Sequence, residues 1–375
     1  MVFQTQELRM DLLAWYDRSH RKLPWRDSRD PYAILVSELM LQQTQVKTVV
    51  PYYLRFMKLF PTLQALAMAP EEKVLLAWQG LGYYRRARNL QAAARQIVEE
   101  FHGEFPNTPT GIRALKGVGA YTSAAVASIA FGLNQACLDG NVIRVLTRIL
   151  AFEGDVGRQA VLKRLRDTAQ ELIDPRRPGA FNQAMMELGA TVCTPRSPCC
   201  LVCPVNRFCA SFQTGSDPEL LPRKEKRVRP SKIGFRCLFL FSGERFLLCR
   251  RPEQGLMAGM WELPAQAEAD FKPWQQVVRG RIEEVGPLAV PLVHRFTHLQ
   301  ATYTVTAFRG AGQVVWQEEP KSYADSRWVD LSQLAEIPLT KVLVRLLPQI
   351  RAFFKGGALC PSAESALPGL RGTPS

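Results

Sequence analysis

The sequence contains no run of 18 or more consecutive apolar residues, so we do not expect a helix that crosses a membrane. It also lacks an apolar N-terminal segment of the kind that directs secretion, which disfavours an oxidising compartment. Acidic residues are few relative to basic ones, 34 against 48, which gives a formal charge of +14 and a pI near 9.6. This imbalance favours a polyanionic partner, most simply nucleic acid; a merely basic soluble protein is the alternative.

No internal repeat is evident, and 375 residues suffice for two or three domains. From about Glu7 to Phe212 apolar residues recur every three or four positions, which is the period of helices. The clearest runs are Leu8–Tyr16, Tyr32–Phe56, Val74–Trp78, Arg85–Phe101 and Ser123–Phe131, and the pattern is punctuated by Pro51, Pro61, Pro70, Pro106 and Pro109.

The second half of the chain has a different pattern. A polar, strongly basic stretch from Gly215 to Lys232 has the composition of a linker. Beyond it, runs rich in aromatic and β-branched residues predict strands at Phe235–Phe241, Phe246–Arg250 and Thr302–Phe308. We therefore expect an all-α domain over residues 1–212, a linker over 213–232, a small α+β domain over 233–353 and a disordered tail over 354–375.

Four cysteines lie close together near mid-chain, after a hydrophobic stretch of helical character. They are Cys193, Cys200, Cys203 and Cys209, with the spacing C-x6-C-x2-C-x5-C. Four thiolates within 17 residues suit one soft metal centre, either tetrahedral zinc or an iron–sulfur cluster. Buried thiols or two disulfides are the alternative, and the missing secretion signal disfavours disulfides. Cys199, next to Cys200, could in principle take its neighbour's place.

Two glycines, Gly117 and Gly119, flank one hydrophobic residue between two helical patterns. Such a turn, continued into a helix N-terminus, can hold a phosphate through backbone N–H groups, although an ordinary helix–helix turn is the alternative. The segment Leu138–Val142 opens the next helix, 20 residues after Gly119. Taken alone, Asp139 or Asn141 could be no more than an N-cap there.

Glu38 is a second acidic candidate. On a helix its neighbours three and four positions away are Ile34, Leu35 and Leu41, so its face is apolar. A carboxylate in such a place is costly unless it is paired or protonated, and burial should raise its pKa, which suits a general acid. A glutamate satisfied by arginine or by backbone groups is the alternative.

Taken together, these segments resemble the helix-hairpin-helix DNA glycosylases, and among them the MutY family of adenine DNA glycosylases. The resemblance covers about residues 23–212 and extends more weakly to about 347. Its carriers are Leu23-Pro24-Trp25-Arg26, Ser37–Thr44, Gly80-Leu81-Gly82-Tyr83-Tyr84, the Gly117–Gly119 hairpin, Leu138–Val142 and the four cysteines.

The resemblance implies a fold and a substrate. It implies a six-helix barrel part at about 24–134, a cluster part at about 1–23 and 135–212, and an active site between them. It further implies a 4Fe–4S cluster on the four cysteines. The substrate would be double-stranded DNA with adenine mispaired with 8-oxoguanine or guanine, and the adenine would be flipped out of the duplex. The hairpin, the cluster loop and basic residues such as Arg196 and Arg207 would grip phosphates.

The resemblance also assigns roles to residues. Glu38 would protonate the leaving adenine, and Asp139 would stabilise the oxocarbenium-like sugar or attack it transiently, with Tyr121 and Asn141 assisting. Arg26 would help line the adenine pocket. The residues expected to wedge into the base stack or contact the lesion-bearing strand are Gln43, Thr44, Leu81 and Tyr83; for the last two, core packing is the alternative.

One position separates this family from its bifunctional relatives, such as endonuclease III. Those enzymes carry a lysine two residues after the second hairpin glycine, and it attacks the sugar to form a Schiff base. Here Tyr121 stands at that position, and without the amine efficient strand cleavage loses its nucleophile. We therefore expect a monofunctional glycosylase.

The C-terminal part resembles the opening of a Nudix (MutT-like) fold. A working pyrophosphohydrolase needs an acidic helix to bind magnesium, and this chain has Gly280 where the first glutamate of that helix should stand. We therefore expect a domain that only binds. In the family a Phe-Ser-His motif checks for 8-oxoguanine, and this sequence has Phe296-Thr297-His298, in which threonine keeps the hydroxyl.

Three rival functions remain: an endonuclease III-type glycosylase/lyase, a non-catalytic or redox-sensing iron–sulfur DNA-binding protein, and a nucleotide pyrophosphohydrolase. Tyr121 argues against the first, the joint presence of Glu38 and Asp139 against the second, and Gly280 against the third. We expect a monomer without membrane association in a bacterial cytoplasm, at the nucleoid.

Overall fold

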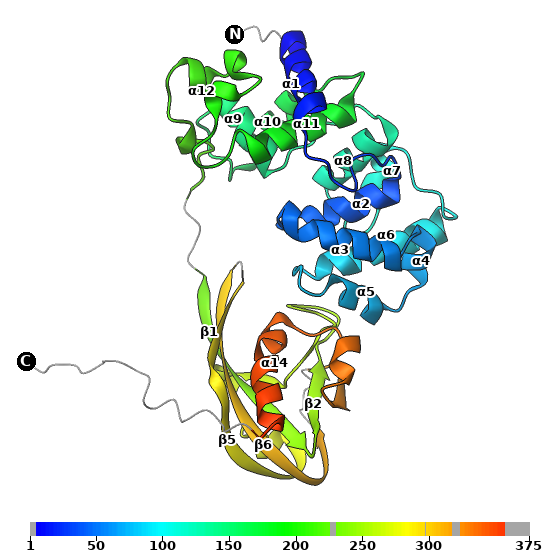
Figure 1. Ribbon diagram of the computed structural model, residues 1–375, viewed down its shortest axis with the longest axis vertical. Coiled ribbons are helices and arrows are strands. Elements are labelled where there is room, and N and C mark those ends of the chain that lie inside the picture. The colour runs from blue at the N-terminus through cyan, green and yellow to red at the C-terminus, as the bar shows by residue number, and fades with distance from the viewer. Residues whose placement is uncertain (1–4, 226–229, 297, 317–322, 357–375) are drawn as a thin grey trace, which may run out of the picture. The chain divides into compact units, whose positions relative to one another are not determined.

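The computed structural model describes residues 5–225, 230–296, 298–316 and 323–356 (Figure 1). The chain divides into two compact units: residues 1–69 with 86–227, and residues 70–85 with 228–375. The first unit is helical, and the second is built around a β-sheet. This agrees with the predicted helical domain followed by an α+β domain, except that residues 70–85 group with the second unit.

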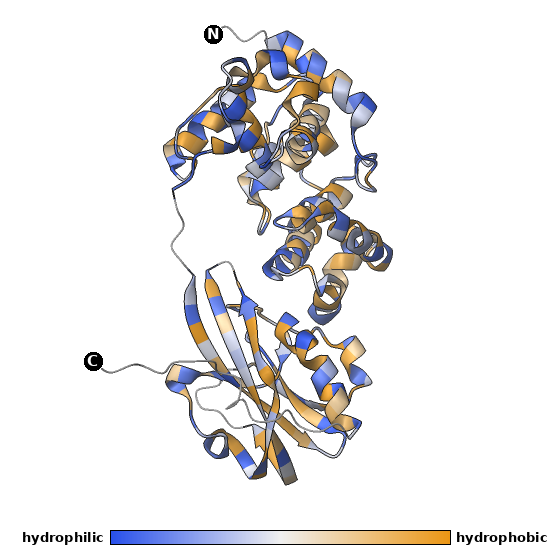
Figure 2. Ribbon diagram, turned by 60° about the vertical axis from the view of Figure 1, so that its left-hand side comes forward, coloured by the Kyte–Doolittle hydropathy of each residue, from blue (hydrophilic) through white to orange (hydrophobic). Residues whose placement is uncertain are grey.

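The first unit consists of short helices whose hydrophobic and hydrophilic residues are interleaved along their length (Figure 2). No described helix is long and apolar enough to cross a bilayer. The helices are α1 (Thr5–Ser19), α2 (Pro31–Leu41), α3 (Val46–Leu59), α4 (Leu63–Met68), α6 (Arg85–Glu100), α7 (Pro109–Ala114), α8 (Ala120–Phe131), α9 (Gly140–Ile149), α10 (Gln159–Leu172), α11 (Pro178–Thr191) and α12 (Ala210–Gln213), with 3-10 turns at Cys200–Val202, Asn206–Phe208 and Pro218–Leu220.

The predicted helical run from Tyr32 to Phe56 is two helices, α2 and α3. Helix α2 ends at Leu41, and the buried guanidinium of Arg86 donates hydrogen bonds to carbonyl oxygens at this end, those of Leu39, Met40 and Gln42. Pro51 was expected to interrupt a helix but lies inside α3. The prediction was wrong because the buried face of α3 outweighs the loss of one backbone hydrogen bond.

Helix α11 is central to the first unit and packs against α1, α8 and α9. Two glycines allow the close approach. A β-carbon on Gly179 would lie 2.6 Å from the carbonyl oxygen of Ser128 in α8, and one on Gly189 would lie 2.6 Å from Cβ of Asn141 in α9. The apolar faces of α1, α9, α10 and α11 form one buried core. Helix α11 therefore fixes the positions of α8 and α9.

The first part of the predicted linker is packed against the first unit. Leu221 is buried, and Arg148 donates from its Nε to the Leu221 carbonyl at 3.2 Å. The carbonyl of Arg223 accepts from the N–H of Val156 at 3.0 Å. The buried leucine and these hydrogen bonds hold residues up to about 225 against the first unit, although the composition predicted a linker there.

The second unit contains a seven-stranded sheet with the central order β3-β2-β1-β6-β5, to which β4 adds on β1 and β7 on β2. Strands β1 and β6 run parallel over 11 residue pairs. The elements are α5 (Glu71–Trp78), β1 (Ser231–Ser242), β2 (Arg245–Arg250), β3 (Trp261–Glu262), β4 (Ala265–Ala267), α13 (Trp274–Val277), β5 (Val278–Arg295), β6 (Leu299–Trp316), β7 (Asp325–Val329) and α14 (Lys341–Phe354), with 3-10 turns at Glu268–Asp270 and Gln333–Glu336.

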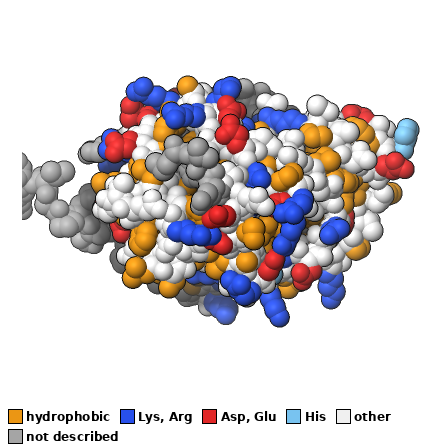
Figure 3. Space-filling model, turned by 90° about the horizontal axis from the view of Figure 1, so that it is seen from above, with side chains coloured by type: hydrophobic (Ala, Val, Ile, Leu, Met, Phe, Trp, Pro, Cys, Tyr) orange, Lys and Arg blue, Asp and Glu red, His pale blue; other side chains and the backbone are white. Residues whose placement is uncertain are grey.

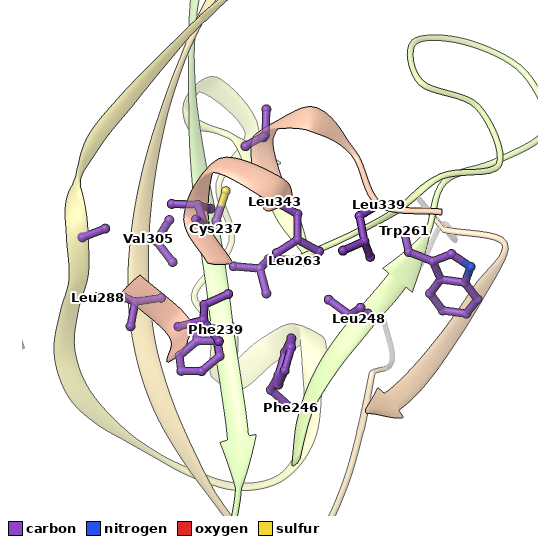
Figure 4. Packing of buried hydrophobic residues seen from close by; sticks show 14 of the residues in the cluster. Cys237, Phe239, Phe246, Leu248, Trp261, Leu263, Leu288, Val305, Leu339 and Leu343 are labelled. Atoms are coloured by element: carbon purple, nitrogen blue, oxygen red, sulfur yellow. The ribbon is translucent and has the colours of Figure 1, made fainter. Parts of the chain in front are cut away.

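Alternation along β1 builds two cores, one on each face of the sheet. Cys237 and Phe239 point to the face covered by α14, where they pack near Leu343 (Figure 4). Leu238 and Leu240 belong to a second core on the other face, which includes Trp274 of α13. The three strands predicted at 235–241, 246–250 and 302–308 are confirmed as β1, β2 and β6, and each observed strand is longer than its prediction.

The segment that corresponds to the acidic Nudix helix is not a helix here. Arg279 to Gly286 belong to β5 and pair with β6, with register shifts between Arg279 and Arg281 and between Glu284 and Gly286. Glu283 and Glu284 are consecutive on a strand and therefore point to opposite faces. The carboxylates that a magnesium site needs on one helical face are thus not brought together in this segment.

Candidate active site and cysteine cluster site

The first unit contains a cavity of about 570 Å³ between α2, the start of α8, the start of α9 and α11. Small-molecule sites commonly have this size. The cavity brings together residues far apart in sequence, and many had been predicted as site residues. Those that line it are Arg26, Glu38, Gln43, Thr44, Gly119, Tyr121, Asp139 and Asn141.

Glu38 projects from α2 into this cavity and is only 6% exposed. Its Oε2 has no hydrogen-bond partner among the described residues. Burial raises the pKa of Glu38 to about 7; the Tyr121 hydroxyl opposes this rise and the Asp139 charge adds to it. A carboxyl group with such a pKa is partly protonated at neutral pH, so Glu38 can donate a proton to a bound molecule.

Asp139 is both the N-cap of α9 and a wall of the cavity. Its Oδ1 accepts from the Val142 N–H at 2.7 Å, and its Oδ2 accepts from Asn141 Nδ2 at 2.9 Å. Burial raises the pKa of Asp139 above its ordinary value, and these hydrogen bonds oppose only part of that rise. The simple N-cap interpretation is therefore true but incomplete, because the same carboxylate also faces the cavity that contains Glu38.

Tyr121 lies on the first turn of α8, and its hydroxyl donates to Met186 Sδ at 3.1 Å. Burial, together with the charge of Glu38, raises the pKa of Tyr121 well above its usual value. The hydroxyl therefore stays protonated and serves as a hydrogen-bond donor beside the two carboxyl groups. It offers no amine for attack on a sugar.

A chain of hydrogen bonds joins the cavity to the cysteine segment. Asn141, which donates to Asp139, accepts from Arg144 Nη2 at 2.8 Å. The same guanidinium donates from Nε to the carbonyl oxygen of Cys193 at 2.8 Å and from Nη2 to that of Gly189 at 2.6 Å. The start of α9 is therefore held against both α11 and the first cysteine.

Glu187 is a cavity residue that the sequence did not predict. It is 1% exposed on α11 and accepts from Arg21 at 2.7 Å and 2.8 Å and from Arg26 Nη2. Burial alone would raise the pKa of Glu187, but the hydrogen bonds from Arg21 and Arg26 outweigh it and lower the pKa to about 2. All three side chains line the cavity, so Arg26 is held there by an ionised carboxylate.

The residues predicted to contact DNA differ in their exposure. Gln43 is exposed just after α2 with a positive φ of 55°, and Thr44 Oγ1 accepts from Arg86 at 3.2 Å. Leu81 is buried within the second unit, which fits core packing, whereas Tyr83 is 50% exposed with a φ of 48°. Gly117 and Gly119 form the exposed turn between α7 and α8.

The four predicted cysteine ligands surround one cavity of about 300 Å³. Cys199 also lies along this cavity but is exposed, whereas the other four are half-buried. Within the described residues, no three His, Cys, Asp or Glu side chains converge closely enough to hold a single metal ion. A cubane cluster is larger than one ion and would be held by thiolates standing around a cavity, so this arrangement fits the 4Fe–4S group.

Arg148 connects the two sides of the cysteine cavity. It is 2% exposed, and its Nη1 donates to Cys193 Sγ at 3.3 Å and to the Thr194 carbonyl at 2.7 Å. Its Nη2 donates to the Pro195 carbonyl at 3.2 Å. A buried cation beside thiolate ligands would lower the cost of their negative charge.

Basic and acidic side chains are mixed on one face of the molecule. In Figure 3, Lys and Arg side chains are interspersed with Asp and Glu on the face shown. Arg207, expected to grip phosphate, is paired with Asp11 at 2.8 Å and with Glu7 at 3.5 Å, so its charge is already compensated. Arg196 is exposed in the cysteine segment and suits a phosphate contact better.

The predicted lesion-recognition motif lies between β5 and β6 in the second unit. Phe296 is partly buried against the α14-side core, and its N–H donates to the Leu299 carbonyl at 2.7 Å. His298 is exposed, and its carbonyl accepts from the Ser231 N–H at 3.2 Å. Thr297 lies outside the described residues.

Comparisons with known proteins agree with this architecture. A family model described as HhH-GPD superfamily base excision DNA repair protein matches residues 36–186, and a NUDIX domain model matches residues 236–349. A solved structure of a thermostable thymine-DNA glycosylase is similar, with a TM-score of 0.51 and 28% identity over 56% of this chain and 97% of that one. The fold and site thus define a helix-hairpin-helix base excision repair glycosylase that also carries a Nudix-like domain.

Curated relatives narrow the class. Adenine DNA glycosylase of Homo sapiens is 38% identical, covering 88% of this chain and 71% of that protein. The protein of the same name from Buchnera aphidicola subsp. Baizongia pistaciae (strain Bp) is 34% identical, covering 77% of this chain and 82% of that one. The chain belongs to the adenine DNA glycosylase family and is an enzyme that hydrolyses N-glycosyl bonds.

Proposed function

We propose that this enzyme hydrolyses the N-glycosidic bond of adenine mispaired with 8-oxoguanine or guanine in double-stranded DNA. The adenine would leave the base stack and enter the 570 Å³ cavity of the first unit. The net charge of +14 suits the required attraction to the phosphate backbone. The enzyme would act as a monomer at the bacterial nucleoid.

Glu38 would act as the general acid. An adenine anion is a poor leaving group, and protonation of a ring nitrogen makes departure possible. The raised pKa of about 7 means that Glu38 still carries its proton near neutral pH. Its unpaired Oε2, buried and facing the cavity, is free to make this hydrogen bond to the base.

Asp139 would stabilise the positive charge that develops on the sugar, or attack it transiently, before water completes hydrolysis. Two hydrogen-bond donors, the Val142 N–H and Asn141 Nδ2, favour its ionised form. Asn141 would keep the carboxylate oriented, and the Tyr121 hydroxyl would stabilise the same region as a donor. A protonated Glu38 and an ionised Asp139 in one cavity would provide the division of labour that this reaction needs.

Other residues would select and present the base. Arg26, fixed by Glu187, would donate hydrogen bonds to acceptor atoms of the adenine. Gln43 and Thr44 at the end of α2 would replace or contact bases in the stack. The exposed Tyr83 would do the same, whereas the buried Leu81 would serve core packing. The Gly117–Gly119 turn would bind a phosphate through backbone N–H groups at the start of α8.

The enzyme would be monofunctional, because Tyr121 occupies the position where a lysine would form a Schiff base. A 4Fe–4S cluster held by Cys193, Cys200, Cys203 and Cys209 would supply structure rather than chemistry, by folding this segment against DNA. Phe296, Thr297 and His298 would check the opposite base for 8-oxoguanine. The strand conformation of residues 279–286 supports a binding role for the second unit, without pyrophosphohydrolase activity.

The observation that carries the proposal is the presence of Glu38 and Asp139 in one buried cavity. The test is single-turnover excision on a duplex with adenine opposite 8-oxoguanine, comparing wild type with Glu38→Gln and Asp139→Asn. Both substitutions preserve size and remove one ionisable group. We expect each variant to lose at least about 100-fold in rate, the usual scale for general acid–base and electrostatic catalysis. Unchanged rates in both would refute the two-carboxylate mechanism.

Two controls separate the rival functions. Borohydride should trap no covalent enzyme–DNA adduct; a trapped adduct would favour an endonuclease III-type lyase. A wild-type protein that binds the duplex but never releases adenine would favour a non-catalytic DNA-binding protein. Comparing 8-oxoguanine with guanine opposite adenine, in wild type and in Thr297→Ala, measures how far that residue contributes to lesion recognition.

A further inference from the structure

The segment between α8 and α9 reaches Asp139 without regular structure. Residues 132–139 form neither helix nor strand, so their backbone polar groups need partners elsewhere. Its start is tied to α8, since the Leu133 N–H donates to the Ala127 carbonyl at 3.0 Å. The next four residues depend on two side-chain amides, one from α10 and one from α11.

Asn182 of α11 makes hydrogen bonds to the buried side of the segment. Its Nδ2 donates to the Gln135 carbonyl at 2.8 Å, and its Oδ1 accepts from the Cys137 N–H at 2.9 Å. The second Nδ2 hydrogen donates to Ser128 Oγ of α8 at 2.8 Å. Asn182 is 3% exposed, so a lost bond here could not be replaced by bulk water.

Gln170 of α10 makes an equivalent pair of hydrogen bonds on the solvent-facing side of the segment. Its Nε2 donates to the Asn134 carbonyl at 3.0 Å, and its Oε1 accepts from the Ala136 N–H at 2.9 Å. Each amide thus binds a carbonyl and the N–H two residues later, as one residue of a neighbouring parallel strand would. The two amides grip alternate residues from opposite sides, but only Gln170 is exposed.

We infer that Asn182 is a positioning residue for base excision: by fixing Gln135 and Cys137 between α8 and α11, it sets the place of the Asp139 carboxylate in the cavity. This inference rests on the proposed role of Asp139. Only Leu138 separates Cys137 from Asp139, so movement of Cys137 is passed directly to the carboxylate. Asn141 and Val142 hold Asp139 from the other side.

The structure provides a matched pair of variants. Asn182→Ala removes the buried amide, and Gln170→Ala removes the exposed one from the same segment. Each variant is compared with wild type and Asp139→Asn for single-turnover adenine excision opposite 8-oxoguanine. Binding is measured separately on the same duplex with 2′-fluoro-2′-deoxyadenosine as the target, which disfavours a positively charged sugar and resists excision.

For Asn182→Ala we expect a rate loss of about 10- to 100-fold, as for a catalytic group displaced by about 1 Å. Its affinity for the fluorinated duplex should stay within about twofold, since the hydrogen bonds of Asn182 go to Ser128, Gln135 and Cys137, which do not line the cavity. Gln170→Ala should excise adenine within about twofold of wild type, because water can replace the exposed amide.

The pH–rate profile distinguishes positioning from a general loss of folded protein. The groups around Glu38 are Tyr121 from α8, Cys137 and Asp139 from the segment, and Arg21, Arg26 and Glu187, which line the same cavity. Asp139 raises the pKa of Glu38, so its displacement should move the high-pH limb of the profile to lower pH. A smaller amount of folded enzyme would lower the rate equally at every pH.

Equal rates and equal pH profiles for Asn182→Ala and Gln170→Ala would overturn the inference, provided that wild type excises adenine and Asp139→Asn does not. Failure of wild type itself would instead refute the proposed function. If Asn182→Ala does not fold, Asn182→Asp keeps its volume and the acceptor for Cys137, and should lose rate in the same direction. Independently, the Cys137 amide of wild type should exchange as slowly as the amides of α11; fast exchange would overturn the inference.

Discussion

The backbone of Gly117 lies directly against the side chain of Asn89 on α6. A β-carbon at Gly117 would stand 2.3 Å from Cβ of Asn89, and its φ of 75° is in the left-handed region. Gly119, two residues later, has a φ of −82°, and a β-carbon there would meet only Arg113 Nη1 at 3.7 Å. The hairpin sequence contains two glycines, but only the first position requires one.

Gly117→Ala should therefore destabilise the protein by about 1–3 kcal/mol, the cost of a strained backbone position, and should weaken duplex binding by disturbing the turn. The matched control is Gly119→Ser, which occupies the N-cap of α8 with extended backbone and has room for its side chain. It should be neutral or slightly stabilising, since serine is a good N-cap. Denaturant unfolding measures both, and equal losses would contradict the assignment.

The raised pKa of Glu38 predicts that the excision rate and the stability of wild type both fall as pH rises, over neighbouring pH ranges. Because the protonated form is the proposed acid, the wild-type excision rate should fall as pH rises through about 7. The folded pKa lies above the ordinary value of 4.5, so wild type also loses stability as pH rises from about 4.5 to about 7. Glu38→Gln has no such loss.

The stability of Glu38→Gln relative to wild type should therefore increase between pH 4.5 and about 7 and then level off. Urea unfolding at several pH values measures this difference. A difference that does not change with pH would mean that Glu38 titrates normally in the folded protein. Asp139→Asn offers a comparison in which the cap to Val142 can be kept while the charge is removed.

Local patterns predicted Glu38 and Asp139, because a carboxylate on an apolar helix and an acid before a helix are visible within a few residues. Glu187 also stands in an apolar helix, yet its meaning depends on Arg21 and Arg26, which are 166 and 161 residues away. Asn182 and Gln170 show no local signal at all, since their partners belong to another segment.

The fold of the second unit shows the same limit. Its aromatic and β-branched runs predicted strands correctly, because their period is local. The sequence Arg279–Gly286 resembles part of a helical box, but pairing with β6 makes it a strand. Tertiary pairing outweighs local resemblance in this segment. The packing of the linker up to Glu225 was likewise invisible, because it depends on Arg148 and Glu153 in the first unit.

The Arg21–Glu187–Arg26 group predicts a stability change at acid pH. Its hydrogen bonds lower the pKa of Glu187 to about 2, so the stabilisation is present above the ordinary value of 4.5 and is lost as pH falls from about 4.5 to about 2. Glu187→Gln leaves two arginines in the cavity without their carboxylate. It should cost on the order of 2 kcal/mol at neutral pH, less than a fully buried pair because Arg21 is partly exposed.

Asp17→Asn is the control for that experiment, because Asp17 pairs with Arg177 on the surface, where both side chains are nearly half exposed. It should change the free energy of unfolding by less than about 1 kcal/mol. Glu187→Gln should also slow adenine excision, since Arg26 loses its anchor, whereas Asp17→Asn should not. Equal effects of the two substitutions on stability and rate would show that the ion pairs of Glu187 contribute no more than an ordinary surface ion pair.

Arg148 and Arg196 should separate the cluster from DNA binding. Arg148 is buried and bonds Cys193 Sγ and the carbonyls of Thr194 and Pro195, whereas Arg196 is exposed in the same segment. Arg148→Gln removes the cation beside the thiolates and should speed loss of iron, followed as bleaching near roughly 400 nm in the presence of a chelator. Arg196→Gln should keep the cluster but weaken duplex binding and reduce its salt dependence by about one phosphate contact. If Arg148→Gln keeps its iron as long as Arg196→Gln does, the buried guanidinium does not stabilise the cluster; colourless wild-type protein containing one zinc would refute the cluster itself.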